Sequence, residues 1–219
     1  MPTPWLNLPN AITLGRIALA VLLAPMLLVD SVGMRSAAFL VFLVAAFSDL
    51  VDGRLARSRN LITDFGKLVD PLADKLLLAA TFGPFYWLSH GGEPATPFPW
   101  FGDILPWWIL AIIFGREAFI TGFRGFAAKR GVVLAAGSAG KLKAVFQNIA
   151  IGAIILWYAL QSAAREHGWD SRFWKGFWIP FHRLFAIAAL TVAVALTVWS
   201  LGVYLQSFRR LGMERKAAP

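Results

Sequence analysis

The sequence predicts an all-α membrane protein with six transmembrane helices and a polar cavity that faces the cytoplasm. Of its 219 residues, 58% are hydrophobic and only 15% are charged, whereas a soluble domain carries about 25% charged residues. Several apolar stretches reach the roughly 20 residues that a helix needs to cross a bilayer. The chain has no cysteine, which excludes disulfides and thiolate metal ligands. We therefore expect residues 1–219 to form one membrane domain without a separate soluble module.

The apolar stretches give six expected spans, at about 11–29, 36–57, 65–89, 104–129, 140–163 and 178–206. Residues 1–10 are expected to lie along the membrane interface, with Asn10 or Thr13 capping the first helix. We interpret that helix as a retained span and not as a cleaved signal. Arg16 lies one turn inside it, and its sequence position is equally compatible with snorkelling to the head groups and with a contact in the polar cavity. The Pro- and Gly-rich stretch 91–99 is expected to lack regular structure.

The charges of the connecting segments predict the orientation in the membrane. Residues 89–103 contain no Lys or Arg, while Arg59, Lys129 and Arg130 lie in or beside the links at the other membrane face. Because cytoplasmic loops carry an excess of cations, both termini, including the tail 208–219, are expected in the cytoplasm. The segment 165–175, with three cations on the expected outer side, argues against this orientation.

The net charge of +9 suits contact with anionic membrane lipids and phosphorylated substrates. The chain shows no basic and aromatic array of the kind that binds nucleic acid, and we expect no nucleic-acid partner.

Four carboxylates, Asp49, Asp52, Asp70 and Asp74, lie at the adjoining ends of the second and third expected spans. An acidic side chain in hydrocarbon costs about 2.5–3.5 kcal/mol on insertion scales, so a chain that keeps several together is normally using them. Helical spacing places each pair on one helix face. Carboxylate oxygens suit hard cations, and the pattern predicts a site for Mg²⁺ or Mn²⁺. The alternative is that the acids are solvated helix ends.

A second group of polar residues lies in and beside the fourth and fifth spans. Four cations in apolar surroundings indicate a receptor for a phosphate monoester, since the Arg fork and the Lys point charge suit that group. The alternative is a set of intramembrane ion pairs with the aspartates. These cations are Arg116, Arg124, Lys141 and Lys143.

The acidic segment has a recognisable pattern, Asp-x2-Asp-Gly-x2-Ala-Arg-x8-Gly-x3-Asp-x3-Asp, which runs from Asp49 to Asp74. It resembles the signature of the CDP-alcohol phosphotransferases at all eight positions. The stretches 8–13 and 63–75, together with Arg116-Glu117 and Gly140-Lys141-x-Lys143, resemble the bacterial phosphatidylglycerophosphate synthases. This resemblance covers the chain to about Gln147 and fades in the sixth span, and the segments 89–103 and 163–177 are longer than is usual there.

The resemblance implies a membrane enzyme of the bacterial inner membrane, and the loop charges predict that its active site and both termini face the cytoplasm. It would transfer the phosphatidyl group of CDP-diacylglycerol to glycerol 3-phosphate and release CMP. The resemblance also implies a homodimer and two Mg²⁺ or Mn²⁺ ions held by Asp49, Asp52 and Asp70, with Asp74 as a further ligand or the catalytic base.

By the same resemblance, the acceptor phosphate would lie against Arg116, Arg124, Lys141 and Lys143. The residues expected to bind CDP-diacylglycerol are Asp52, Gly53, Ala56, Arg57, Gly66 and Lys75. Small residues on these acidic faces would let a bulky anionic ligand approach the backbone.

Two alternatives stay open at the level of sequence. The acceptor could instead be inositol phosphate, serine or phosphatidylglycerol, because the cations favour a phosphorylated polyol without choosing one. In a different class, the acids could line the ion path of a cation transporter. A transporter predicts polar residues across the whole membrane and commonly repeated halves, and the sequence shows neither.

Overall fold

The computed structural model describes residues 7–58, 63–91, 96–129 and 138–217; within these ranges the side chains at 50–58, 64, 67, 128–129, 138–139 and 207–217 are left undescribed. Every regular element in the described residues is helical, which confirms the all-α fold class for this part of the chain. The long helices are α1 (Leu8–Leu28), α2 (Val32–Ser58), α3 (Asp64–His90), α4 (Trp107–Lys129), α5 (Ser138–His167) and α6 (Ile179–Ala217). Two short elements, η1 (Phe101–Asp103) and η2 (Trp174–Trp178), precede α4 and α6.

Four apolar segments are long and apolar enough to cross a membrane, so the chain is a membrane protein. Within the described residues they are Leu8–Leu28, Val32–Asp49, Gly140–His167 and Trp174–Gln206. The helices α3 and α4 are not among them. Six spans therefore stay a prediction.

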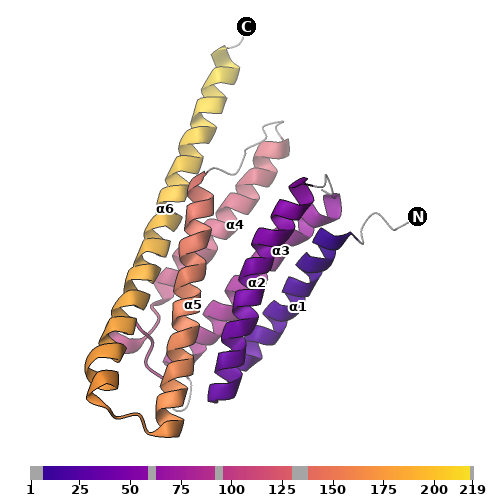
Figure 1. Cartoon of the computed structure of the whole chain (residues 1–219). Coiled ribbons are helices and arrows are strands. Elements are labelled where there is room, and N and C mark those ends of the chain that lie inside the picture. The colour runs from indigo at the N-terminus through magenta and orange to yellow at the C-terminus, as the bar shows by residue number, and fades with distance from the viewer. Residues whose placement is uncertain (1–6, 59–62, 92–95, 130–137, 218–219) are drawn as a thin grey trace. The chain divides into compact units, whose positions relative to one another are not determined.

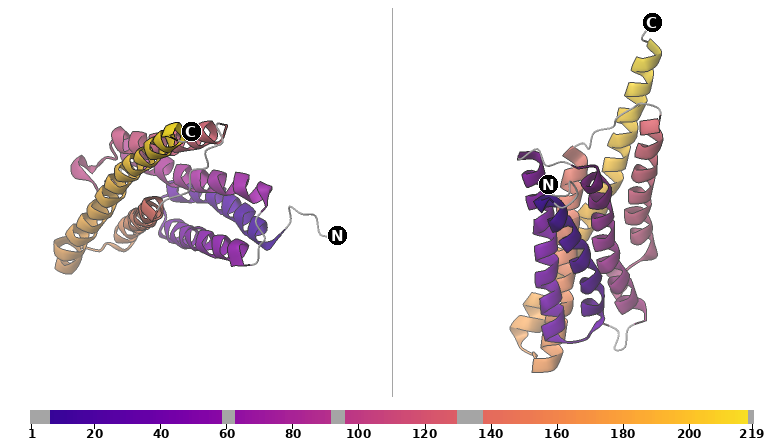
Figure 2. Two further views of the ribbon diagram at one scale, coloured as in Figure 1. Left: turned by 90° about the horizontal axis from the view of Figure 1, so that it is seen from above. Right: turned by 90° about the vertical axis from the view of Figure 1, so that its right-hand side faces the viewer.

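The chain divides into two compact units, of which the first comprises residues 1–105 and 151–184. In this unit α1 packs against both α2 and α3, and the three helices lie side by side in Figures 1 and 2. Helix α2 runs in the opposite direction to α1 and α3 (Figure 1). The start of α1, the end of α2 and the start of α3 consequently lie at one end of the three-helix group.

The starts of α1 and α3 are fixed by side-chain caps. The side chain of Asn7 accepts a hydrogen bond from the backbone N–H of Asn10 at 2.9 Å, and Pro9 lies in the first turn. The expectation that Asn10 or Thr13 caps this helix was therefore wrong. Proline suits a first turn because the missing N–H has no helical partner there, so α1 begins earlier than expected. Thr63 caps α3 by accepting a hydrogen bond from the N–H of Gly66 at 3.0 Å.

The described residues of the stretch 91–99 form no helix or strand, as expected, but hydrogen bonds fix the segment before α4. The N–H of Phe98 donates to the carbonyl of Asp103 at 2.8 Å, and the short helix η1 lies between them. The indole Nε1 of Trp157 donates to the carbonyl of Pro97 at 2.8 Å. Arg183 donates to the carbonyl of Trp100 at 2.7 Å. The described part of this segment is thus bound to the helices of the first unit.

The segment 163–177 is also largely helical. Helix α5 continues to His167, and the π-helical turn η2 leads directly into α6. Two of the three cations that argued against the predicted orientation are paired with acids: Arg165 with Asp30 and Lys175 with Asp170.

The second unit comprises residues 106–150 and 185–219. Arg124 of α4 donates to the hydroxyl of Tyr204 in α6 at 3.3 Å and lies over its ring, 5.6 Å from the ring centroid. The ring of Phe123 meets the same tyrosine edge to face, with centroids 5.9 Å apart. These contacts connect α4 to the C-terminal half of α6.

Candidate functional site

One end of the first unit carries Asp49, Asp70 and Asp74 and is called the acidic end. Arg16 of α1 lies at its centre. This side chain is only 1% exposed, and its Nη1 lies 2.8 Å from Oδ1 of Asp49 in α2 and 3.1 Å from Oδ1 of Asp74 in α3. The two aspartate side chains stay 49% and 59% exposed. Arg16 therefore contacts the acids and does not snorkel to the head groups, which decides between its two interpretations.

Two further polar residues of α1 contact the first turns of α3. The hydroxyl of Thr13 donates to Oδ1 of Asp70 at 2.8 Å, while the carbonyl of Pro9 lies farther away at 3.1 Å. The side-chain amide of Asn10 donates to the hydroxyl of Thr63, the α3 cap, at 2.9 Å. Asn10, Thr13 and Arg16 follow one another at intervals of three residues, so helical geometry places them along one broad face.

Gly66 of α3 packs directly against the side chain of Asn10 in α1. A Cβ atom at this position would stand 2.8 Å from Oδ1 of Asn10 and 3.3 Å from Oγ1 of Thr63. Real Cβ atoms essentially never approach another heavy atom within 3.0 Å. The glycine therefore permits close packing of α1 on α3, a reason for a small residue that the sequence did not reveal.

The arrangement fits a divalent cation in its donor chemistry. Carboxylates from two helices are gathered by one arginine, keep exposed surface, and offer the hard oxygen ligands that Mg²⁺ and Mn²⁺ prefer. Among the side chains that the structure describes, no three His, Cys, Asp or Glu residues are grouped closely enough to hold a metal. The side chains of Asp52, Gly53, Ala56 and Arg57 lie outside the described ones. Lys75, expected to contact the donor, is described and is partly buried.

A second cluster, in the second unit, joins α4 to α5 through Glu117. Its Oε1 accepts from Nη1 of Arg116 at 3.0 Å and is also bound by Nζ of Lys143, which is 5% exposed. Two of the four predicted acceptor cations thus share one carboxylate. Gln147, one turn beyond Lys143, is buried, and its side-chain nitrogen has no hydrogen-bond partner in the described part of the chain.

The other two predicted acceptor cations have different surroundings. Arg124 contacts Tyr204, as described above, and Lys141 is exposed. Among the described residues, the ion pair of Arg116 is with its neighbour Glu117 and not with an aspartate. Sequence reasoning placed Glu117 in a motif but gave it no role at the site, although its position beside Arg116 was a usable signal.

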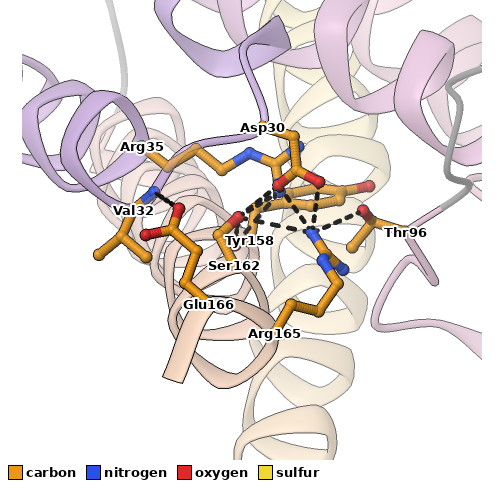
Figure 3. A network of polar contacts seen from close by, with 8 residues as sticks. All are labelled: Asp30, Val32, Arg35, Thr96, Tyr158, Ser162, Arg165 and Glu166. Atoms are coloured by element: carbon orange, nitrogen blue, oxygen red, sulfur yellow. Dashed lines mark hydrogen bonds and ion pairs between the residues drawn. The ribbon is translucent and has the colours of Figure 1, made fainter. Parts of the chain in front are cut away.

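A third polar network lies at the opposite end of α2 (Figure 3). Asp30, in the turn before α2, receives hydrogen bonds from Arg165 at 2.8 and 3.0 Å and from the Ser162 hydroxyl at 2.7 Å. Nη1 of the buried Arg35 lies 2.9 Å from the same carboxylate. Burial alone would raise the pKa of Asp30, but the hydrogen bonds from Ser162 and Arg165 and the charges of Arg35 and Arg165 outweigh it and hold that pKa below 3.8. The network connects the α1–α2 turn to the end of α5.

The comparisons with known proteins agree with the acidic pattern. A sequence model of the CDP-alcohol phosphatidyltransferase family matches residues 6–199. A Bacillus subtilis protein named CDP-diacylglycerol–glycerol-3-phosphate 3-phosphatidyltransferase is 38% identical over 162 residues, which are 68% of this chain and 77% of that protein. An Arabidopsis thaliana protein, the second of that name, is 31% identical over 96% of this chain and 83% of its own length. A rice cardiolipin synthase (CMP-forming) is 31% identical over 96% of this chain and 60% of its own length.

Proposed function

Because this chain belongs to the CDP-alcohol phosphatidyltransferase family, we propose that it transfers the phosphatidyl group of CDP-diacylglycerol to sn-glycerol 3-phosphate. The products are phosphatidylglycerophosphate and CMP, so the protein acts in phospholipid biosynthesis. The printed names of the Bacillus and Arabidopsis relatives support this donor and this acceptor. The observation that carries the proposal is the match of residues 6–199 to the family model.

We assign the acidic end to the diphosphate of the donor. Asp49, Asp52 and Asp70 would hold Mg²⁺ or Mn²⁺, two ions by resemblance to the family, which when bound neutralise the diphosphate and stabilise the charge of an in-line displacement. Support comes from the contacts of Arg16 with Asp49 and of Thr13 with Asp70. The donor contacts at Gly53, Ala56, Arg57, Gly66 and Lys75 stay proposals from the family pattern.

The reaction is a substitution at phosphorus. The free primary hydroxyl of the acceptor forms a new P–O bond to the phosphorus that bears diacylglycerol, and the P–O bond to CMP breaks. The hydroxyl loses its proton, which we assign to the carboxylate of Asp74. Its side chain is 59% exposed and therefore accessible to a substrate from the aqueous side.

The acceptor phosphate is assigned to four cations, Arg116, Arg124, Lys141 and Lys143, of which Arg116 and Lys143 belong to the Glu117 cluster. Glu117 already neutralises part of the charge of Arg116 and Lys143. A phosphate dianion would bind to Arg116 and Lys143, which the carboxylate of Glu117 holds close together. Such charge-assisted hydrogen bonds are stronger than neutral ones, so the cluster offers the phosphate a preformed partner.

We further propose six spans, with α3 and α4 crossing the bilayer in addition to the four apolar segments. These helices have 27 and 23 residues, and at 1.5 Å per residue they extend about 40 and 35 Å, enough for a hydrocarbon core of about 30 Å. Intramembrane charged residues normally face a bundle interior or a polar cavity. The Glu117 ion pairs support that placement for α4.

The proposed location is the bacterial inner membrane, with the acidic end and both termini in the cytoplasm. The absence of Lys and Arg from 89–103 supports this orientation. A homodimer is proposed by family resemblance alone.

The experiment that tests the catalytic assignment compares aspartates at the two ends of α2. Asp49→Asn should lower CMP release from CDP-diacylglycerol and glycerol 3-phosphate at least about a hundredfold, since loss of a metal ligand removes several kcal/mol of charge stabilisation. Asp30→Asn, the matched control in the network of Figure 3, should keep near-parental turnover. Equal turnover in the two variants at limiting Mg²⁺ would refute the assignment.

Phosphatidylglycerol is the second candidate acceptor, because the rice relative is named a cardiolipin synthase. A phosphatidylglycerol acceptor carries a phosphodiester with one negative charge, whereas glycerol 3-phosphate carries a dianionic monoester. Four candidate cations suit the dianion better. The family match supports a role of the acids in group transfer rather than in the ion path of a cation transporter.

A further inference from the structure

Arg16 is a cation shut off from solvent whose anionic partners stay accessible. It is 1% exposed, while Asp49 and Asp74, at 2.8 and 3.1 Å from its Nη1, are 49% and 59% exposed. The two carboxylates come from different helices, and α1 supplies the arginine. One buried charge thus connects all three helices that meet at the acidic end.

Gathering carboxylates at one place costs free energy unless positive charge is supplied, because like charges repel. A divalent cation supplies that charge only while it is bound. Arg16 supplies it permanently, and its planar guanidinium can donate to two carboxylates in a fixed geometry. Thr13 adds a hydrogen bond of 2.8 Å to the third described acid, Asp70.

We propose that Arg16 is a positioning residue, a built-in counter-cation that holds Asp49 and Asp74 together before a divalent cation binds. Thr13 orients Asp70 in the same way. This inference rests on the metal assignment made above and deepens it. The competing explanation is that Arg16 forms an ordinary structural ion pair, which would stabilise the protein equally with and without metal.

The first test measures the melting temperature of purified Arg16→Gln in detergent, without substrates, in EDTA and in saturating Mn²⁺. In EDTA the variant should melt several degrees below the parent, because the acids repel one another. Mn²⁺ should restore most of that loss, since the metal takes over the missing countercharge. The rise in melting temperature on adding Mn²⁺ should therefore be larger in the variant than in the parent.

Arg35→Gln is the matched control. Arg35 is also 1% exposed, and it contacts Asp30 at 2.9 Å and Ser162 at 2.7 Å in the network of Figure 3. Its loss should lower the melting temperature by the same amount in EDTA and in Mn²⁺. If Arg16→Gln behaves as Arg35→Gln does, the proposal is wrong and Arg16 is only structural.

A milder variant keeps the test decisive if Arg16→Gln does not fold. Thr13→Val removes the hydroxyl at nearly constant volume and should raise the Mn²⁺ concentration for half-maximal thermal stabilisation about tenfold, the lower range for loss of a group that orients a metal ligand. Thr13→Ser should keep the parental value. Thr81→Val is the control, because among the described residues the buried Thr81 hydroxyl donates to the helix carbonyls of Leu77 and Leu78 and to no other group. Equal Mn²⁺ dependence in the two valine variants would overturn the proposal.

Activity provides a readout that separates positioning from substrate binding. Arg16→Lys keeps the charge without the fork and should recover part of the kcat that Arg16→Gln loses, with little change in the KM for glycerol 3-phosphate. No recovery of kcat by lysine would contradict the counter-cation role.

Failure of this inference and failure of the metal assignment would give different experimental results. If the parent binds no Mn²⁺ in electron paramagnetic resonance titrations and Mn²⁺ does not change its melting temperature, the assignment of the metal site is wrong. The inference about Arg16 then fails as well. If the parent binds Mn²⁺ but Arg16→Gln shows no metal-dependent rescue, only the inference fails.

Discussion

Gly66→Ala tests the packing of α1 on α3, on which the acidic end depends. The added Cβ would stand 2.8 Å from Oδ1 of Asn10, which is 3% exposed and therefore has little room to move. Displacing Asn10 breaks its 2.9 Å hydrogen bond to Thr63, at a cost of about 1 kcal/mol. Overpacking adds about 2 kcal/mol, and the better helix propensity of alanine returns about 1 kcal/mol. The net loss of about 2 kcal/mol corresponds to a melting temperature lower by about 4–8 °C for a chain of this size.

The assay is thermal unfolding of the purified variant in detergent, followed by tryptophan fluorescence. Gly83→Ala, in the same helix, is the control, because its Cβ would meet nothing within 4 Å, and its melting temperature should stay unchanged or rise slightly. In an Asn10→Ala background the cost of Gly66→Ala should largely disappear. A Gly66→Ala variant as stable as the parent, or equally destabilised in both backgrounds, would refute the packing argument.

Three further predictions concern the acceptor, the far end of α2 and the orientation. Lys143→Ala should raise the KM for glycerol 3-phosphate about 10- to 150-fold, the value of one charged hydrogen bond, and leave the donor KM nearly unchanged; equal effects on both KM values would contradict the acceptor assignment. Because the pKa of Asp30 is held below 3.8 in the folded protein, its stabilising contribution is present above that pH and is lost as the pH falls through the lower folded value. Acid titrations of the melting temperature should therefore be flatter for Asp30→Asn, and an unchanged curve would count against the network. Phe101→Cys, at an exposed position of a chain without cysteine, should react with an impermeant thiol reagent in intact cells; labelling only after permeabilisation would reverse the proposed orientation.

The helices themselves could be predicted from the sequence because apolar residues predominate along each of them. Their ends were less certain. The interface segment was expected to extend to Asn10, yet α1 begins at Leu8 and Asn7 caps it, since Pro9 fits a first turn as well as it fits a loop. Residues 163–177 were expected to form a long connecting segment, whereas most of them belong to helices.

The candidate site could be predicted only as a set of residue types. The acids and the cations were identified by charge in apolar surroundings, but their partners depend on tertiary contacts. The contact of Arg16 with Asp74 spans 58 positions in the chain, and local periodicity carries no information at that distance. For the same reason the sequence left the role of Arg16 undecided. It also suggested that Gly66 is small to admit a ligand, whereas in the structure the space beside Gly66 is taken by the side chain of Asn10. It also overlooked Glu117 as the carboxylate shared by Arg116 and Lys143.

The most direct test of the central claim is to supply the purified protein with CDP-diacylglycerol, Mg²⁺ and one acceptor at a time, and to measure CMP release. The acceptors are glycerol 3-phosphate, glycerol, inositol phosphate, serine and phosphatidylglycerol. We expect rapid CMP release with glycerol 3-phosphate, together with formation of phosphatidylglycerophosphate, and very little release with glycerol, which lacks the phosphate. Comparable release with glycerol, or faster release with phosphatidylglycerol than with glycerol 3-phosphate, would contradict the proposed function.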